Sequence, residues 1–157
     1  MVIVNDACIA LIKSFEGLFL EAYHDKIDKD GIDTIGFGTI KYPPYYMNGK
    51  MVKVGDPKIT QQQAIDFLRW EVELKAKAID PLLRDDLTPN QFAALISFTY
   101  NLGEGSLKQS TLRKVVNENP NNPYIRDCFE MWINANGKPI AGLLRRRKAE
   151  ADLYFKP

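Results

Sequence analysis

The sequence predicts an α+β fold, because strand-forming residues and helical periods occupy separate stretches of the chain. Residues 6–16 have helical spacing, residues 18–40 are rich in strand formers and turn residues, and the spacing is helical again from residue 60 onward. Segregated strands and helices are typical of α+β folds, whereas parallel sheets need strands and helices that alternate.

The length of 157 residues fits a single domain built from two lobes. We expect a small antiparallel β-sheet in a lobe at about 17–59, a long linking helix at about 60–80, and a mostly helical lobe at about 81–157 on which the first helix packs. Because ligands usually bind between lobes, we expect a cleft there.

The first helix, at 6–16, can be capped by Asn5 or Asp6 and stopped by Gly17. Its apolar face has helical spacing and consists of Cys8, Leu11, Ile12 and Phe15.

The predicted sheet follows this helix. Its strand formers are Phe19, Tyr23, Thr34, Ile35, Phe37, Thr39 and Ile40. Turns are expected at Asp28, Asp30 and Gly31. Gly36 and Gly38 indicate either the close approach of a ligand such as a glycan, or a bulge or tight packing of the sheet.

The linking helix has clear signals at both ends. Residues 41–57, rich in Pro and Gly, predict a turn-rich connection before it, Thr60 with Gln63 predicts a capping box, and Pro81 predicts its end. The predicted buried stripe consists of Ile65, Leu68, Val72, Ala76 and Ile79.

The rest of the chain is predicted to be helical. Thr88, Pro89 and Gln91 open a helix whose body, 92–102, is apolar on all sides, as at the centre of a bundle, and the last helix is expected at about 142–154.

Two shorter helices are predicted between these. Ser110 or Thr111 opens the first, Asn122 and Pro123 open the second, and Gly137 closes the second. The apolar face of the second consists of Ile125, Cys128, Phe129, Trp132 and Ile133.

Composition excludes several classes of function. The formal net charge of +1 gives no field that attracts a polyanion, so we expect no nucleic-acid partner. One histidine, and two cysteines without a Cys-x-x-Cys pair, argue against a zinc site, and we expect no cofactor. Cys8 and Cys128 are either buried apolar residues or one long-range disulfide.

The chain carries no predicted membrane signal. No apolar stretch approaches the ~20 residues needed to cross a bilayer, and the start lacks the basic segment of a signal peptide. We therefore expect a complete protein, made in the cytoplasm and not inserted into a membrane.

Candidate chemistry lies near the N-terminus. Glu16 ends a helix, where partial negative charge raises the pKa of a partly buried carboxyl group, as a general acid requires. Asp25 and Thr34 follow on the sheet, where a carboxylate and a hydroxyl could activate and hold a water across a glycosidic bond. Taken singly, the three residues are more typical of a surface glutamate, a solvated turn aspartate and an ordinary strand threonine.

Five segments together resemble one family. They are Phe-Glu-Gly-Leu-Phe-Leu-Glu-Ala-Tyr-His-Asp with Asp-Thr-Ile-Gly-Phe-Gly-Thr, residues 87–103, Ser110-Thr111-Leu112 and residues 142–150. In this order they are similar to the phage-type lysozymes, or endolysins, of glycoside hydrolase family 24. The resemblance covers nearly the whole chain and implies a lysozyme-like fold.

The resemblance implies a muramidase that cleaves the β-1,4 bond between N-acetylmuramic acid and N-acetylglucosamine in peptidoglycan. Glu16 then corresponds to the general acid, and Asp25 and Thr34 place the attacking water, with inversion at the anomeric carbon. The implied partners are the glycan strands and a holin-type helper that opens the membrane, and the protein is expected to act as a monomer. The alternative from another class is a glycan-binding module without turnover.

Further substrate contacts are implied at Tyr100, Asn101, Ser110 and Thr111. The alternatives are a core tyrosine, a helix-ending asparagine and helix caps.

The basic run Arg145-Arg146-Arg147-Lys148 is either a solvated helix face, an attraction for anionic cell-wall polymers, or the source of an arginine that pairs with Glu16, as the family implies. His24 neighbours Asp25 in a strand, so its side chain should point to the other face.

Two features depart from the family pattern. The loop between Asp25 and Thr34, which holds Ile27, Asp28, Lys29 and Asp30, is longer than in the best-known member. Thr39 stands where many relatives have a histidine, so an ion pair of the family is expected to be absent.

Overall fold

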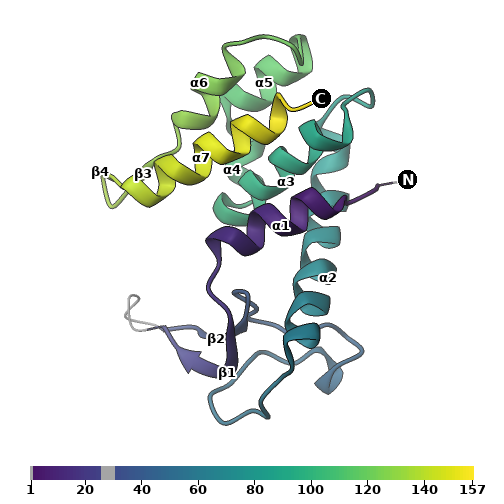
Figure 1. Cartoon of the computed structure of the whole chain (residues 1–157), viewed down its shortest axis with the longest axis vertical. Coiled ribbons are helices and arrows are strands. Elements are labelled where there is room, and N and C mark those ends of the chain that lie inside the picture. The colour runs from purple at the N-terminus through teal and green to yellow at the C-terminus, as the bar shows by residue number, and fades with distance from the viewer. Residues whose placement is uncertain (1, 26–30) are drawn as a thin grey trace. The chain divides into compact units, whose positions relative to one another are not determined.

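The computed structural model describes residues 2–25 and 31–157, and its helices and strands confirm the α+β class (Figure 1). The chain divides into two compact units. The sheet unit is Lys13–Val72. The helical unit consists of the residues up to Ile12 together with Glu73–Pro157. The predicted turn residues Asp28 and Asp30, and the rest of the loop 27–30, lie outside the described residues.

The sheet unit contains the predicted antiparallel pair, β1 (Phe19–His24) and β2 (Asp33–Gly36). Tyr23 pairs with Thr34 and His24 pairs with Asp33, while the register shifts between Phe19 and Tyr23. Strands of six and four residues form a small hairpin, in which paired side chains share a face.

A tight turn follows β2 and accounts for its two glycines. Ile35 and Thr39 exchange backbone hydrogen bonds of 2.9 and 2.8 Å across the turn, and Gly36 and Gly38 have φ values of 65° and 85°. A Cβ on Gly36 would also lie 3.4 Å from the Cβ of Ala64. The turn and the packing therefore explain these glycines without a ligand.

Thr39 lies inside the core of the sheet unit. Its side chain is fully buried, and its hydroxyl oxygen has no hydrogen-bond partner among the residues that the structure describes.

The connection between β2 and the next helix is irregular, as predicted. It contains a bridge between Lys41 and Met51 and a short 3₁₀ turn, η1 (Met47–Gly49). Asp56 holds it together by accepting hydrogen bonds from the Tyr42 hydroxyl at 3.0 Å and the Lys50 ammonium at 2.6 Å.

Helix α2 (Gln61–Ile79) begins with the predicted capping box. The Thr60 amide donates to Gln63 Oε1 at 2.9 Å, and the Gln63 amide donates to Thr60 Oγ1 at 3.1 Å. Four members of the predicted stripe are fully buried: Leu68, Val72, Ala76 and Ile79. The helix ends in a 3₁₀ turn, η2 (Asp80–Leu82), which contains the predicted stop, Pro81.

In the helical unit, α3 (Pro89–Leu102) is the predicted central helix. Its capping box is formed by Thr88 and Gln91, and nearly every residue from Ala93 to Thr99 is fully buried. It packs against α7 (Ala141–Tyr154), which lies beside it in Figure 1.

Shorter helices complete the unit. They are α4 (Glu104–Gln109), α5 (Thr111–Glu118) and α6 (Ile125–Glu130). Sequence periodicity did not separate α4 from its neighbours, since six residues give less than two turns. Both cysteines are buried in this unit with free thiols, so the disulfide alternative is wrong.

The prediction of a helix up to Gly137 is wrong. Helix α6 ends at Glu130, and a small hairpin follows, with β3 (Asn134–Ala135) paired to β4 (Lys138–Pro139). Asn136 and Gly137 have φ values of 52° and 76°, as in a two-residue hairpin turn of type I′.

The stop predicted at Gly17 is also wrong in its mechanism. Helix α1 (Asp6–Phe15) ends one residue earlier than predicted, and Gly17 does not have the positive φ of a glycine cap. A Cβ on Gly17 would lie 3.0 Å from the Phe19 ring, so the glycine makes room for that ring.

Candidate functional site

The β1–β2 hairpin separates the candidate residues onto two faces. Tyr23 and Asp25 are two residues apart, so their side chains lie on the same face, and Thr34 pairs with Tyr23 on that face. The backbone amide of Asp25 donates to the Ile32 carbonyl oxygen at 3.3 Å, which continues the pairing beyond the end of β1. One face of the hairpin therefore carries two of the three predicted catalytic residues.

The other face carries His24, as predicted. Its Nδ1 lies 2.6 Å from Asp33 Oδ1, and the backbone amide of Val54 donates to Asp33 Oδ2 at 2.9 Å. The hydrogen bond with His24 has the larger effect on Asp33, and together with the bond from Val54 it holds the pKa of Asp33 below its usual value. His24 therefore ties the hairpin together and faces away from Asp25.

Glu16 follows the last residue of α1 and is half-buried. Its charge acts on the same tyrosine that pairs with Thr34: burial, then the negative charges of Asp25 and Glu16, raise the pKa of Tyr23. A hydrogen bond with the Thr34 side chain acts in the opposite direction and lowers this pKa, but its effect is the smallest of the four. Asp25 and Thr34 thus share one face of the hairpin with Tyr23, and Glu16, in the same compact unit, lies near enough for its charge to act on that tyrosine.

Sequence reasoning placed Tyr23 in a strand and missed it as a site residue. The signal was present, because a strand residue two positions before Asp25 must share its face. The ring of Tyr23 is held by Phe19, with ring centroids 4.3 Å apart.

Thr34 is buried, with 8% of its surface exposed. Its Oγ1 donates to the Ile32 carbonyl oxygen at 3.1 Å. A hydroxyl in this setting is fixed in direction and can accept further hydrogen bonds.

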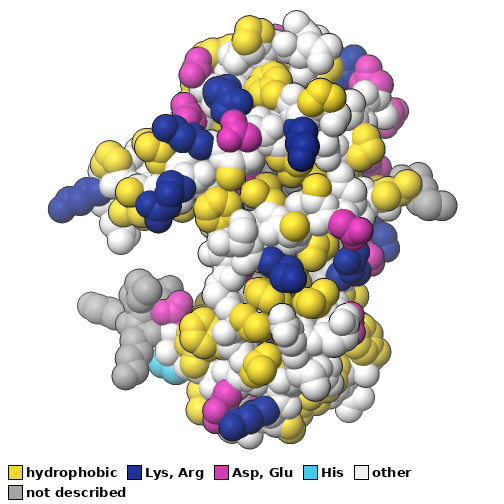
Figure 2. All heavy atoms as spheres, viewed as in Figure 1, with side chains coloured by type: hydrophobic (Ala, Val, Ile, Leu, Met, Phe, Trp, Pro, Cys, Tyr) yellow, Lys and Arg dark blue, Asp and Glu magenta, His cyan; other side chains and the backbone are white. Residues whose placement is uncertain are grey.

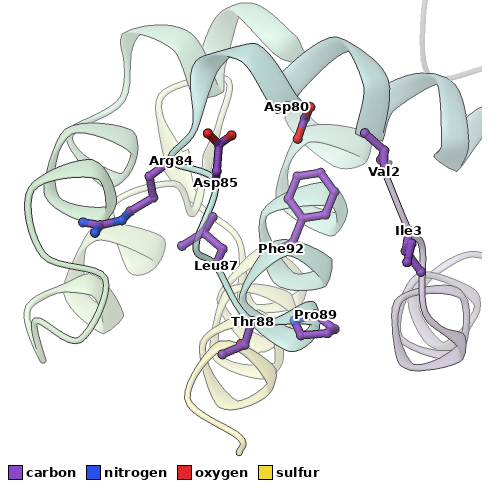
Figure 3. Close-up of a pocket in the computed structure, with 9 residues that line it drawn as sticks. All are labelled: Val2, Ile3, Asp80, Arg84, Asp85, Leu87, Thr88, Pro89 and Phe92. Carbon is purple, nitrogen blue, oxygen red and sulfur yellow. The ribbon is translucent and has the colours of Figure 1, made fainter.

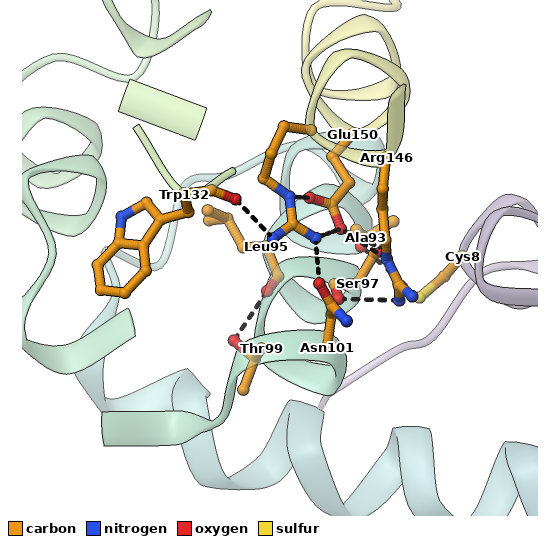
Figure 4. A network of polar contacts seen from close by, with 10 residues as sticks. Cys8, Ala93, Leu95, Ser97, Thr99, Asn101, Trp132, Arg146 and Glu150 are labelled. Carbon is orange, nitrogen blue, oxygen red and sulfur yellow. Dashed lines mark hydrogen bonds and ion pairs between the residues drawn. The ribbon is translucent and has the colours of Figure 1, made fainter. Parts of the chain in front are cut away.

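The substrate contacts predicted in the helical unit belong partly to a buried polar network (Figure 4). Asn101 Oδ1 accepts a hydrogen bond of 2.8 Å from Arg147 Nη2, and Arg147 lies 2.6 Å from Glu150. The Ser97 hydroxyl donates to Glu150 Oε2 at 2.6 Å. The side-chain oxygen of Asn101 is thus engaged within the protein, and Tyr100, the residue before it, is half-buried.

The helix-cap alternative holds for Ser110. Its hydroxyl donates to the Leu107 carbonyl oxygen at 2.7 Å and accepts from the Arg113 amide at 3.0 Å, at the N-terminus of α5. Only 2% of Ser110 is exposed, whereas Thr111 is exposed. Substrate contact at Tyr100, Asn101, Ser110 and Thr111 stays a prediction.

The basic run on α7 divides between core and surface. Arg146 and Arg147 are buried and form ion pairs with Glu150, whereas Arg145 and Lys148 are exposed. Figure 2 shows Lys and Arg side chains on the surface over α6, α7 and the β3–β4 hairpin. The solvated-face alternative is therefore correct for only half of the run, and an arginine partner for Glu16 stays a prediction.

A pocket of about 410 Å³ lies in the helical unit, between the start of the chain and the start of α3 (Figure 3). Val2, Leu87 and Phe92 give it apolar walls, and Asp80 and Asp85 line it as well. None of the seven predicted site residues lines this pocket.

Residues 2–25 and 31–157 contain no group of three His, Cys, Asp or Glu side chains that could hold a metal ion. Within the same residues, no helix combines the length and the apolar character that a membrane span requires.

Comparison with known proteins identifies the family. Residues 13–150 match the family described as phage lysozyme. The endolysin of Bacillus phage B103 is 36% identical over 152 residues, which are 97% of this chain but only 54% of that protein. The chain thus spans about half the length of that relative.

Solved structures agree with this assignment and confirm the lysozyme-like fold. The endolysin from Escherichia coli O157:H7 phage FAHEc1 has a TM-score of 0.81 and 38% identity, and the match covers 98% of this chain and 93% of that one. The muramidase domain of SpmX from Asticaccaulis excentricus has a TM-score of 0.79 and 30% identity, with 100% of both chains covered. The chain belongs to the phage lysozyme family.

Proposed function

We propose that this chain is an endolysin-type muramidase, which hydrolyses the β-1,4 bond between N-acetylmuramic acid and N-acetylglucosamine in bacterial peptidoglycan. The observation that supports the proposal is the shared hairpin face of Asp25 and Thr34, together with the effect of the Glu16 charge on Tyr23 of that face. The family assignment supports the substrate class, and the name of the SpmX muramidase domain supports the choice of bond.

The chemistry follows from two carboxyl groups with different roles. Glu16, in its protonated form, gives its proton to the glycosidic oxygen as the bond to the anomeric carbon breaks. A water attacks that carbon from the opposite face, and Asp25 takes the proton that the water loses. The Thr34 hydroxyl holds this water, and the product is inverted at the anomeric carbon. After the reaction Glu16 is deprotonated and Asp25 is protonated, and proton exchange with solvent restores both groups for the next cycle.

The biological setting is proposed to be lysis of a bacterial cell. The protein acts as a monomer on glycan strands, and a holin-type partner opens the membrane so that it reaches the wall from the cytoplasm. No cofactor takes part, since two carboxyl groups and a water are sufficient for glycoside hydrolysis.

The test is a turbidity assay on purified cell walls with Glu16→Gln, Asp25→Asn and a matched control. Because general acid catalysis contributes about 10²–10⁴-fold, Glu16→Gln should lower the initial rate by about that factor. Asp152→Asn is the control, since Asp152 is an exposed carboxylate on α7 of the helical unit, where it pairs with Arg126 at 2.8 Å. It should clear walls at the parent rate.

Two outcomes contradict the proposal. If Glu16→Gln clears walls as fast as the parent, the acid is assigned wrongly. If the parent protein binds walls without clearing them, the chain is a glycan-binding module, which is the alternative function.

A further inference from the structure

Phe19 is an aromatic residue that the β1–β2 hairpin holds in place but does not bury. It is the first residue of β1, and 45% of its surface is exposed. Single exposed apolar side chains are common on protein surfaces, so exposure alone indicates no function. What distinguishes Phe19 is the position of its ring.

Two contacts fix the Phe19 ring. Its centroid lies 4.3 Å from that of the Tyr23 ring, with an angle of 43° between the two ring planes. Its edge lies against Gly17, since a Cβ at Gly17 would be 3.0 Å from Cε2 of Phe19. A side chain that is already held in place loses little conformational freedom when a ligand binds, so more of its contact energy contributes to affinity.

The same two contacts place the ring beside the proposed site. Gly17 directly follows Glu16 in the chain. Tyr23 pairs with Thr34, on the hairpin face that also carries Asp25. The ring of Phe19 therefore touches the residue next to the proposed acid and a member of the face that carries the other two catalytic candidates.

The chemistry of this surface favours a sugar as its ligand. A pyranose ring has an apolar face of C–H groups and a rim of polar groups, and it therefore fits an aromatic ring that has polar groups beside it. Phe19 supplies the aromatic ring, and the Tyr23 hydroxyl and the Asp25 carboxylate supply polar groups on the adjoining face. The negative charges of Asp25 and Glu16, which both act on Tyr23, disfavour an anionic lipid surface.

We propose that Phe19 is a substrate-binding residue of this hydrolase, whose ring stacks on the apolar face of one sugar of the glycan strand. This inference rests on the proposed function and adds a contact that determines how tightly the strand is held. The ring has no polar atom that could act on the charge of the transition state, so it binds substrate and transition state equally. Loss of the ring should therefore raise KM and leave kcat unchanged.

The test is Phe19→Ala, with initial rates measured on soluble, uncrosslinked glycan strands. Loss of one aromatic contact should raise KM roughly threefold to tenfold and leave kcat within about twofold. A variant that only destabilised the fold would instead contain fewer active molecules, which lowers the apparent kcat at an unchanged KM.

Two conservative variants identify the property that matters. Phe19→Tyr keeps a flat aromatic ring and should keep the parent KM. Phe19→Leu keeps an apolar side chain without a flat face, and its KM should rise as in Phe19→Ala. Tyr45→Ala is the matched control, because Tyr45 is an aromatic residue of the same unit that is 67% exposed and lies outside the hairpin, and it should keep the parent KM.

A binding measurement distinguishes the sugar from the peptide of the wall. The Glu16→Gln protein, with and without Phe19→Ala, is titrated calorimetrically with glycan strands that keep their stem peptides and with strands from which these peptides have been removed. Phe19→Ala should raise Kd for both kinds of strand by the same factor as KM.

Three results would overturn the inference. They are a parent-like KM for Phe19→Ala, an equal rise in KM for Tyr45→Ala, and a loss of affinity confined to strands that keep their stem peptides. Any of them, obtained while Glu16→Gln is inactive, removes the role of Phe19 alone. Full activity of Glu16→Gln would instead remove the proposed function.

Discussion

The buried charges of α7 give the largest stability effect that we predict. Glu150 is fully buried and lies 2.6 Å from Arg147 Nε and 3.4 Å from Arg146 Nε, with 5% or less of either arginine side chain exposed. Glu150→Gln keeps the shape of the side chain but removes the only negative charge among these contacts. Two buried guanidinium groups then lose their counter-charge, which costs about 3–5 kcal/mol.

For a chain of this length, that loss corresponds to a fall in melting temperature of roughly 6–20 °C. The assay is urea unfolding at pH 7, followed by circular dichroism, with an unchanged m-value as the sign that only stability has changed. Ser97→Ala removes one hydrogen bond of 2.6 Å to the same carboxylate and should cost less, about 1.5–3 kcal/mol.

An exposed ion pair supplies the control. Glu21 and Lys58 are 70% and 74% exposed, so Glu21→Gln should move the melting temperature by no more than about 2 °C. If Glu150→Gln behaves like this exposed control, the carboxylate is not compensating buried charge, and the reasoning fails.

Three further predictions concern other parts of the chain. Burial, and then the charge of Glu150, raise the pKa of the Cys8 thiol to about 12, and burial also raises the pKa of the Cys128 thiol. Neither thiol should therefore react with Ellman's reagent at pH 8 until the protein unfolds, and fast reaction of the folded protein would contradict this. Gly137→Ala should destabilise the protein by about 1–2 kcal/mol, because the φ of Gly137 is 76°. Gly105 is a helical position with open space around the Cβ, so Gly105→Ala should stabilise the protein by up to about 1 kcal/mol, and equal effects of the two variants in thermal unfolding would refute the backbone argument. Hydrogen bonds from His24 and the Val54 amide lower the pKa of Asp33, so their stabilising effect is complete above about pH 4 and is lost as the pH falls through the lowered value. Asp33→Asn should therefore flatten the acid limb of a plot of melting temperature against pH.

Local chemistry made much of the fold predictable. The capping boxes at Thr60 and Thr88 are formed by residues three positions apart, so they can be found without knowledge of tertiary structure, and both are present. The same holds for the apolar α3, whose composition alone indicates a central helix. Short elements such as α4 and the β3–β4 hairpin were missed because they contain too few residues to establish a period.

The failures have physical causes of the same kind. Asn136-Gly137 is a strong hairpin signal, but the apolar residues before it fit a helical face, and the glycine was therefore assigned to a helix end. The stop at Gly17 was misassigned because a glycine after a helix has two uses, a left-handed cap and space for a neighbouring ring, and only the structure distinguishes them.

The sequence predicts which residues belong to the candidate site, but it does not predict how they are arranged in space. Glu16, Asp25 and Thr34 were named through the family resemblance, since their spacing alone is more typical of a surface glutamate, a turn aspartate and a strand threonine. The pairing of Tyr23 with Thr34 depends on the register of β1 against β2, which the sequence does not determine by itself. The burial of Arg147 could not be foreseen either, because a basic run on a helix is usually solvated.

The most direct test of the account is mass spectrometry of peptidoglycan digested in ¹⁸O-labelled water by the parent protein and by Glu16→Gln. The account predicts fragments that end in N-acetylmuramic acid with one labelled oxygen at the anomeric carbon, and almost none from the variant. Anhydro ends, labelled N-acetylglucosamine ends, or the same fragments in equal yield from Glu16→Gln would contradict it.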